Sequence, residues 1–260
     1  MQDPSIIRLF FFIVGFSLFA VWETKFPRKQ LTQNRAVRWL NNLGLIGVNS
    51  ICTALLMPIV AYQAALLVEQ HGIGLFNMIS LPYPLVVFAS VVLLDLAIYT
   101  QHVVFHYFPI LWKLHRVHHA DQDIDVTTAA RFHPIEIILS LWIKIACITL
   151  LGAPAIAVLI FEVLLNVSAM FNHSNGRMPL ALDKQLRKLF VTPDMHRVHH
   201  SIKIKETNSN FGFFLSIWDR MFSTYIPQPE LGHDKCVIGI DAFREPKEQH
   251  LNKMLTQPFR

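Results

Sequence analysis

Charged residues are scarce in this chain of 260 residues. Asp, Glu, Lys and Arg together make up 16% of the sequence, whereas a soluble domain carries about a quarter. Hydrophobic residues make up 53%. So few charges argue against a soluble globular protein, and we expect much of the surface to face lipid.

Cysteine is also rare, and the three that occur, Cys52, Cys147 and Cys236, form no CxxC pair. We therefore expect no disulfide framework and interpret each as a packing residue. The sequence has no CxxCH haem-attachment motif and no glycine-rich nucleotide-binding motif. Its net charge is +5, but no basic run is interleaved with aromatic residues. The lack of such a run argues against nucleic-acid binding. We expect Lys and Arg instead to set the membrane topology and to bind anionic lipid headgroups.

Apolar runs of the length that crosses a bilayer, roughly 20 residues, are present in four places. They are Ser5–Trp22, about Leu43–Val68, Leu81 to about Gln101, and Ile135–Phe171. The first lacks a basic flank and a cleavage site, so we expect a retained helix. The fourth is too long for one span, and Gly152-Ala153-Pro154 predicts a hairpin of helices over 135–151 and 155–171. Lys144 inside it is costly at membrane depth unless it faces other helices or water.

The loops predict the orientation of these spans. Five Lys or Arg residues lie in the loop over 23–42 and none in the loop over 69–80, so the positive-inside rule places the first loop in the cytoplasm. The third span then delivers the chain from His102 onward to the cytoplasm. The hairpin returns the chain to the same side, so residues from about Asn172 to Arg260 are also cytoplasmic. The predicted fold is an all-α integral membrane protein with about three transmembrane helices, a helical hairpin and a cytoplasmic helical cap. We divide it into N-terminal helices (1–80), a histidine-bearing domain (81–226) and a C-terminal tail (227–260).

Histidines recur in this sequence at metal-ligand spacings. His102 and His106 form an H-x3-H pair, and residues i and i+4 share one helix face. The pentapeptide HRVHH occurs twice, over 115–119 and over 196–200. These three motifs contain eight candidate metal ligands, which are His102, His106, His115, His118, His119, His196, His199 and His200.

His133 and His173 are available as further ligands. One zinc ion takes four protein ligands in a structural site and three in a catalytic site, so eight to ten imidazoles predict two metal ions. Imidazole suits iron, copper, zinc or nickel, and open positions on two irons would allow O2 to be activated. His133 could equally be a packing residue. We interpret His71, His233 and His250 as structural or solvated.

Other polar residues near the motifs could orient the imidazoles, because a ligating histidine usually donates its second N–H to a carboxylate or carbonyl. The candidates are Asp95, Asp121, Asp194, Asn208 and Asn210, and a capping or solvent-facing role is open for each. The aromatic-rich stretch over 210–225 predicts a helix that lies at the membrane interface. Core packing alone would explain its pattern, and the functional alternative is a lid or wall of an acyl-chain channel.

In sequence order these elements resemble the fatty acid hydroxylase and sterol desaturase superfamily. The matching segments are HVVFH, LWKLHRVHHAD, RFHPIE, FNHSN, TPDMHRVHHS and TNSNFGFFLSIWDRMFSTY. The resemblance implies a membrane enzyme with a histidine-bound, non-haem di-iron centre that uses O2 and two electrons. It carries the ligand role to the eight histidines above and to His173. One departure is Ala169, which stands where some relatives have the first histidine of an H-x3-H pair, so that ligand must be His133, another group or water.

The resemblance also implies a separate electron donor of the cytochrome b5 or ferredoxin type, and the compact chain looks like the bacterial members, whose location would be the inner membrane. We therefore expect a membrane-bound di-iron oxygenase, with two Fe2+ ions and O2, that hydroxylates or desaturates a C–H bond of a fatty acyl chain, sterol or related lipid. Two alternatives are a metal-ion transporter, which needs polar sites near the membrane midplane, and an inactive scaffold that keeps a structural metal site.

Overall fold

The computed structural model describes residues 3–260. These residues form helices joined by loops, with only isolated β-bridges, so the all-α prediction is confirmed. Five helices are long: α1 Pro4–Lys25, α2 Arg35–Leu56, α5 Tyr83–Tyr107, α7 Pro134–Leu151 and α8 Ala155–His173. The shorter ones are α3 Ala61–His71, α4 Leu75–Met78, α6 Pro109–His119, α9 Leu180–Leu186, α10 Pro193–His199, α11 Ile204–Thr207, α12 Ile217–Met221, α13 Gly232–Lys235, α14 Leu251–Met254 and the 3-10 turns η1 Val126–Ala130, η2 Pro246–Gln249 and η3 Gln257–Phe259.

Four of the long helices correspond to predicted spans. Helices α1, α5, α7 and α8 are each long and apolar enough to cross a bilayer, and so is the stretch Arg35–Met78, which contains the predicted second span. The predicted hairpin is present, because Gly152 ends α7 in the left-handed region at φ +71° and Pro154 precedes the first residue of α8. Lys144 on α7 donates to Glu162 on α8 at 3.0 Å, and Arg8 on α1 lies 3.2 Å from the same carboxylate. The intramembrane charge therefore faces other helices.

The prediction of one continuous helix over Leu43–Val68 is wrong. Helix α2 ends at Leu56, and α3 begins only at Ala61. The break lies at Pro58, which has no N–H for a helical hydrogen bond and disfavours the helical conformation of the residue before it. Met57 is extended accordingly, with φ −106° and ψ 117°.

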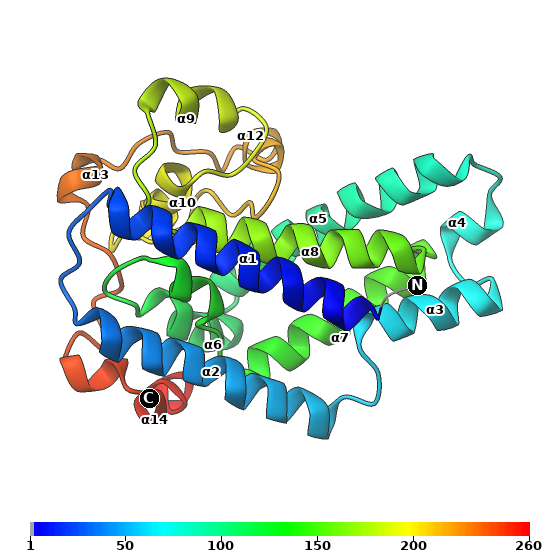
Figure 1. The fold of residues 1–260 in the computed structure, drawn as a ribbon, viewed down its shortest axis with the longest axis horizontal. Coiled ribbons are helices and arrows are strands. Elements are labelled where there is room, and N and C mark those ends of the chain that lie inside the picture. The colour runs from blue at the N-terminus through cyan, green and yellow to red at the C-terminus, as the bar shows by residue number, and fades with distance from the viewer. Residues whose placement is uncertain (1–2) are drawn as a thin grey trace.

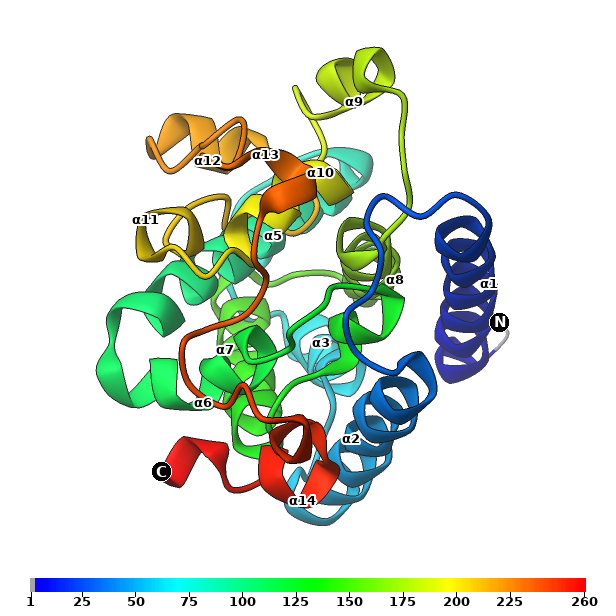
Figure 2. The ribbon, with the colours of Figure 1, turned by 90° about the vertical axis from the view of Figure 1, so that its left-hand side faces the viewer.

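The histidine-bearing segments gather at one end of the long helices. Figure 1 shows α6, α10 and the C-terminal elements at this end, and Figure 2 views it directly. A buried cluster that includes Leu94, Ile148, Val158 and Phe161 joins α3, α5, α7 and α8 beneath it. The site therefore rests on helices that pack closely with one another.

The prediction of one helix over the aromatic-rich stretch 210–225 is also wrong. Only Ile217–Met221 is helical, and Asn210 and Ser223 adopt φ values of +51° and +58°. The Asp219 carboxylate accepts the backbone N–H groups of Phe211 and Gly212 at 2.7 and 2.9 Å. Because these donors are used by a side chain, this stretch folds as a turn against the site.

Candidate metal centre

Nine histidine side chains meet in two groups at the end of the helices. In each group the candidate ligand atoms lie within 4.8 Å of one another, and all nine residues are buried. Group A consists of His102, His106, His115, His119 and His199, and group B consists of His118, His173, His196 and His200. All eight motif histidines and His173 are thus brought together.

The two HRVHH copies contribute to the groups in opposite proportions. In α6, His115 and His119 enter group A while His118 enters group B. In the second copy, which lies in α10 and its C-cap, His196 and His200 enter group B while His199 enters group A. Residues i and i+4 share a helix face, so each copy sends its outer pair to one group and its middle histidine to the other.

Two more helices complete the groups. Near the C-terminal end of α5, His102 and His106 face group A from consecutive turns. His173, the last residue of α8, faces group B. Group A therefore receives its imidazoles from three segments of chain, and so does group B. Neither group can form before the long helices and the α10 segment have come together.

The ring nitrogens are spaced as ligands of a metal ion would be. The Nε2 atoms of His102 and His115 lie 3.1 Å apart, and His173 Nε2 lies 3.1 and 3.0 Å from Nε2 of His118 and His196. Two ligand nitrogens at about 2.0–2.1 Å from one ion lie about 3 Å apart when they subtend a right angle. Among residues 3–260, Nε2 of His106 and His199 has no hydrogen-bond partner. Buried nitrogens normally find one, so this donor set fits metal ions.

The protonation state of the histidines also suits metal binding. Burial lowers the pKa of His115 to about 3. Burial, and then the neighbouring histidines, lower the pKa of His118 and His199 well below the ordinary value. The imidazoles are therefore neutral near pH 7, which is the form that binds a metal ion.

Outer hydrogen bonds orient four of the five imidazoles of group A through Nδ1. His102 contacts the carbonyl oxygen of Phe211 and His199 that of Ser209, both at 2.7 Å. His106 contacts Asn208 Oδ1 at 3.2 Å, so the structure places this predicted orienting residue beside a candidate ligand. The segment 208–211 thus provides three of the four partners.

The fourth partner, Glu136, was missed by sequence reasoning. Its Oε1 lies 2.6 Å from Nδ1 of His115, and the side chain is buried in the first turn of α7. Its Oε2 has no partner among residues 3–260. The available signal was an acidic residue within RFHPIE at the start of an apolar helix, because such a residue is costly to bury without a partner.

The other predicted orienting residues contact no histidine of either group. Asp95 accepts from Trp218 Nε1 at 2.8 Å and the Leu215 N–H at 3.2 Å. The Asn210 side-chain amide donates to the carbonyls of Met195 and Ile226 at 2.9 and 2.8 Å. Both therefore hold the stretch 208–218 in place, and Asn210 acts on the imidazoles only through its neighbours.

Asp121 and Asp194 are paired with arginine. Asp121 accepts from Arg38 at 2.8 and 2.9 Å. Burial raises the pKa of Asp121, but Arg38 and Arg131 outweigh it and lower this pKa to about 2. Asp194 is paired with Arg197 and lies 3.2 Å from Arg28 Nε. These pairs fix the backbone beside the two HRVHH copies.

The structure does not bring His133 to either group. Its Nδ1 accepts the Ile135 N–H at 3.2 Å and caps α7, while Nε2 lies 3.3 Å from the Leu255 carbonyl oxygen. His133 thus does not replace the histidine that the resemblance implies at position 169. The Ala169 carbonyl oxygen instead contacts His173 Nδ1 at 2.6 Å.

Comparisons with known proteins identify the family of the chain. A family model described as fatty acid hydroxylase matches residues 87–224. The ornithine lipid hydroxylase OlsE of Rhizobium tropici is 30% identical over 151 residues, 57% of this chain and 44% of the relative. The alkylglycerol monooxygenase of Danio rerio is 30% identical over 149 residues, 56% of this chain and 31% of the relative. The alkylglycerol monooxygenase of Homo sapiens is 28% identical over 169 residues, 64% of this chain and 36% of the relative.

The matches span less than half the length of each of these relatives. No solved structure matches the chain.

Proposed function

Because the chain belongs to the fatty acid hydroxylase family, we propose that it is a membrane-bound oxygenase that hydroxylates a C–H bond of a lipid. The observation that carries this proposal is the division of nine buried histidines into two groups at one end of apolar helices. Hydroxylation is favoured over desaturation because the relatives are a lipid hydroxylase and alkylglycerol monooxygenases. The electrons come from a separate donor, and the histidines lie on the cytoplasmic side.

The Nε2 atoms of groups A and B would hold two iron ions. Iron bound in this way supplies the activation of O2. The part played by the chain's own residues is to keep neutral imidazoles in fixed orientations and to exclude water. Phe132 and Phe213 serve to exclude water, because each ring contacts one histidine of group A and one of group B. The ring centroid of Phe132 lies 6.0 Å from that of His115 and 4.4 Å from that of His118. The ring centroid of Phe213 lies 5.0 Å from that of His102 and 6.3 Å from that of His196.

These two aromatic rings therefore flank the junction of the groups. A lipid C–H bond held beside them would be close to histidines of both groups and shielded from water. The relatives named above act on lipids, and the apolar helices under the groups give a lipid chain a route from the bilayer.

Elemental analysis joined to lipid analysis tests this function. We expect the purified chain to contain about two irons, since each group has at least the three ligands of a catalytic site. Membranes of cells that express it should contain a hydroxylated lipid, heavier by one oxygen, that is missing when His118→Ala and His199→Ala are combined. His250→Ala is the matched control, because His250 is exposed and far from either group in sequence. Full metal content and unchanged product in the double variant would refute the proposal.

A further inference from the structure

Two cations share one carboxylate where α1, α7 and α8 meet. Lys144 Nζ on α7 lies 3.0 Å from Glu162 Oε1 on α8, and Arg8 Nη1 on α1 lies 3.2 Å from Glu162 Oε2. Among residues 3–260, neither cation has another carboxylate within 4.0 Å. We call these three residues the Arg8 cluster. Because Glu162 offsets only one of the two positive charges, the Arg8 cluster has one positive charge in excess.

The Arg8 cluster lies within the apolar length of the helices, near the end that is opposite to the histidine groups. Glu162 comes seven residues after Ala155, where α8 begins, and Lys144 comes seven residues before Leu151, where α7 ends. At a rise of about 1.5 Å per residue, both lie about 10 Å from this end. Figures 1 and 2 show α1, which carries Arg8, running beside α8.

An excess charge is costly at this depth. Helices α7 and α8 contain 18 and 19 residues. Each is therefore about 27 to 28 Å long, close to the roughly 30 Å of a hydrocarbon core. A group about 10 Å from their end is thus surrounded by hydrocarbon and protein rather than by water. Such a charge is retained where it pairs with an opposite charge, so the Arg8 cluster lacks one anion.

Arg8 is the member of the cluster that a ligand can contact. Its side chain is 35% exposed, whereas those of Lys144 and Glu162 are 15% and 5% exposed. Leu9 and Phe11, near it on α1, are exposed apolar residues, so the exposed part of Arg8 faces lipid. A guanidinium has five N–H donors in a planar fork that fits the oxygens of a carboxylate or a phosphate. Arg8 Nε has no hydrogen-bond partner among residues 3–260, so donors remain for a ligand.

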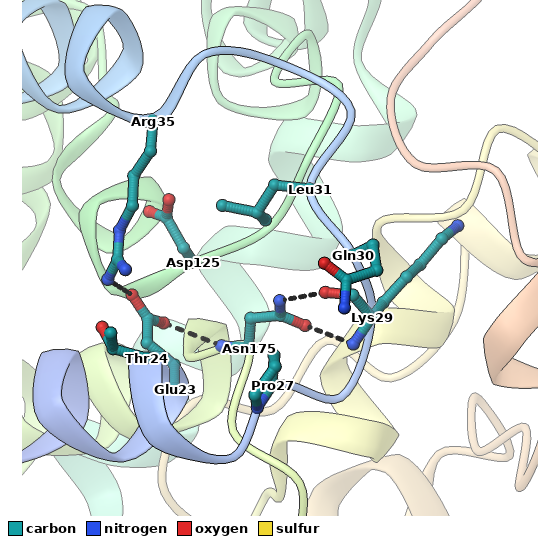
Figure 3. Close-up of a pocket in the computed structure, with 9 residues that line it drawn as sticks. All are labelled: Glu23, Thr24, Pro27, Lys29, Gln30, Leu31, Arg35, Asp125 and Asn175. Carbon is teal, nitrogen blue, oxygen red and sulfur yellow. Dashed lines mark hydrogen bonds and ion pairs between the residues drawn. The ribbon is translucent and has the colours of Figure 1, made fainter.

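A polar pocket at the histidine-bearing end differs from the Arg8 cluster in its balance of charge. Figure 3 shows this pocket, which has a volume of about 230 Å³. Its lining includes two carboxylates and two cations, which are Glu23, Asp125, Lys29 and Arg35. Arg35 lies 3.1 Å from Glu23. The charges of the pocket are therefore equal in number without a ligand, whereas those of the Arg8 cluster are not.

We propose that the Arg8 cluster binds the anionic group of a membrane lipid, a phosphate or a carboxylate, in the leaflet opposite to the histidine groups. The anion supplies the missing negative charge and accepts hydrogen bonds from the guanidinium of Arg8. The hydrocarbon chain of the lipid lies against the exposed apolar side chains of α1. This site is separate from the histidine groups, and it does not depend on the proposed function.

Native mass spectrometry of the full chain, purified in detergent, tests this site. Phosphatidylglycerol, phosphatidylcholine and oleate are the probes, added one at a time, and the bound fraction gives the affinity of each. We expect an anionic probe to bind about tenfold more tightly than the zwitterionic phosphatidylcholine, because only an anionic lipid balances the excess charge. Arg8→Gln should remove this preference. Lys25→Gln is the matched control and should keep it, because Lys25 is an exposed cation at the other end of α1.

Two further variants separate the balance of charge from a loss of structure. Lys144→Gln leaves one cation and one carboxylate, so the preference should also disappear although Arg8 is still present. Glu162→Gln leaves two cations without a carboxylate, so the preference should increase. A single gel-filtration peak verifies that a variant is folded, and Lys144→Gln decides the matter if Arg8→Gln does not fold.

The two anionic probes also identify the source of the anion. A preference for phosphatidylglycerol that depends on Arg8 assigns the anion to a phosphate, and such a preference for oleate alone assigns it to a carboxylate. Equal binding of all three lipids by the unchanged chain would overturn the proposal. So would a preference that Arg8→Gln and Lys144→Gln both retain, because the anionic lipid would then bind elsewhere.

Discussion

Groups A and B draw on the same two repeats, yet the protein holds them differently. Group A has five imidazoles, and four of these contact an outer hydrogen-bond partner through Nδ1. Group B has four imidazoles, and among residues 3–260 only His173 has such a partner. An outer partner fixes the tautomer and the ring orientation of a ligating histidine. Group A is therefore the more preorganised of the two.

Packing takes over part of this role in group B. The His118 ring stacks on Phe132 at 4.4 Å, with 10° between the planes. A stacked ring keeps its plane but gains no partner for Nδ1, which has none among residues 3–260. With one imidazole fewer and looser orientation, group B should exchange its metal ion faster. The comparison teaches that repeated ligand motifs do not produce equivalent sites.

The largest expected effect comes from removing one ligand from each group in turn. His118→Ala leaves group B with three imidazoles, whereas His119→Ala leaves group A with four, all of them held by outer partners. We expect His118→Ala to lose about half of the bound metal, because only the minimum of three imidazoles remains in group B and two of them have no outer partner among residues 3–260. His119→Ala should keep most of it. Metal content per chain measures this, and equal losses in the two variants would contradict the difference between the groups.

A smaller effect is expected from the outer partner of His115. Glu136→Ala should weaken metal binding in group A about 10- to 100-fold, the usual cost of losing such a partner. Glu136→Gln keeps an acceptor oxygen and is the matched control, with a smaller loss. Competition with a chelator, followed by metal analysis, gives the affinities. If Glu136→Ala weakened group B instead, the assignment of His115 to group A would be wrong.

The smallest effect is expected at Asn208. Asn208→Ala removes one neutral hydrogen bond to His106, which contributes about 0.5–1.5 kcal/mol, so group A should lose about two- to tenfold in metal affinity. Asn252→Ala, at an exposed position of α14, serves as the control. The same chelator titration measures both variants. A loss as large as that of Glu136→Ala would show that the neutral and the carboxylate partner are equivalent.

Much of the fold could be predicted because its signals are local. Apolar runs located α1, α5, α7 and α8, and Gly152 with Pro154 located the turn of the hairpin. The second span was located, since it lies within the apolar stretch Arg35–Met78. Its helix break was missed because mean hydropathy averages over Pro58, although that proline alone indicates the break. The stretch 210–225 was misjudged for a different reason: its N–H groups are taken by Asp219, and a pattern of aromatic residues does not show which donors a carboxylate will bind.

The sequence by itself determined the membrane character of the protein and the set of histidines that could bind metal, because both depend on composition and on spacing within a helix. Only the tertiary structure decided how these histidines divide into five and four, that Glu136 and the carbonyls of 209 and 211 orient group A, and that His133 lies apart. These relations join residues up to 109 positions apart, as His102 and Phe211 are. Helical periodicity says which side chains share a face, but the packing of one helix against another decides what that face meets.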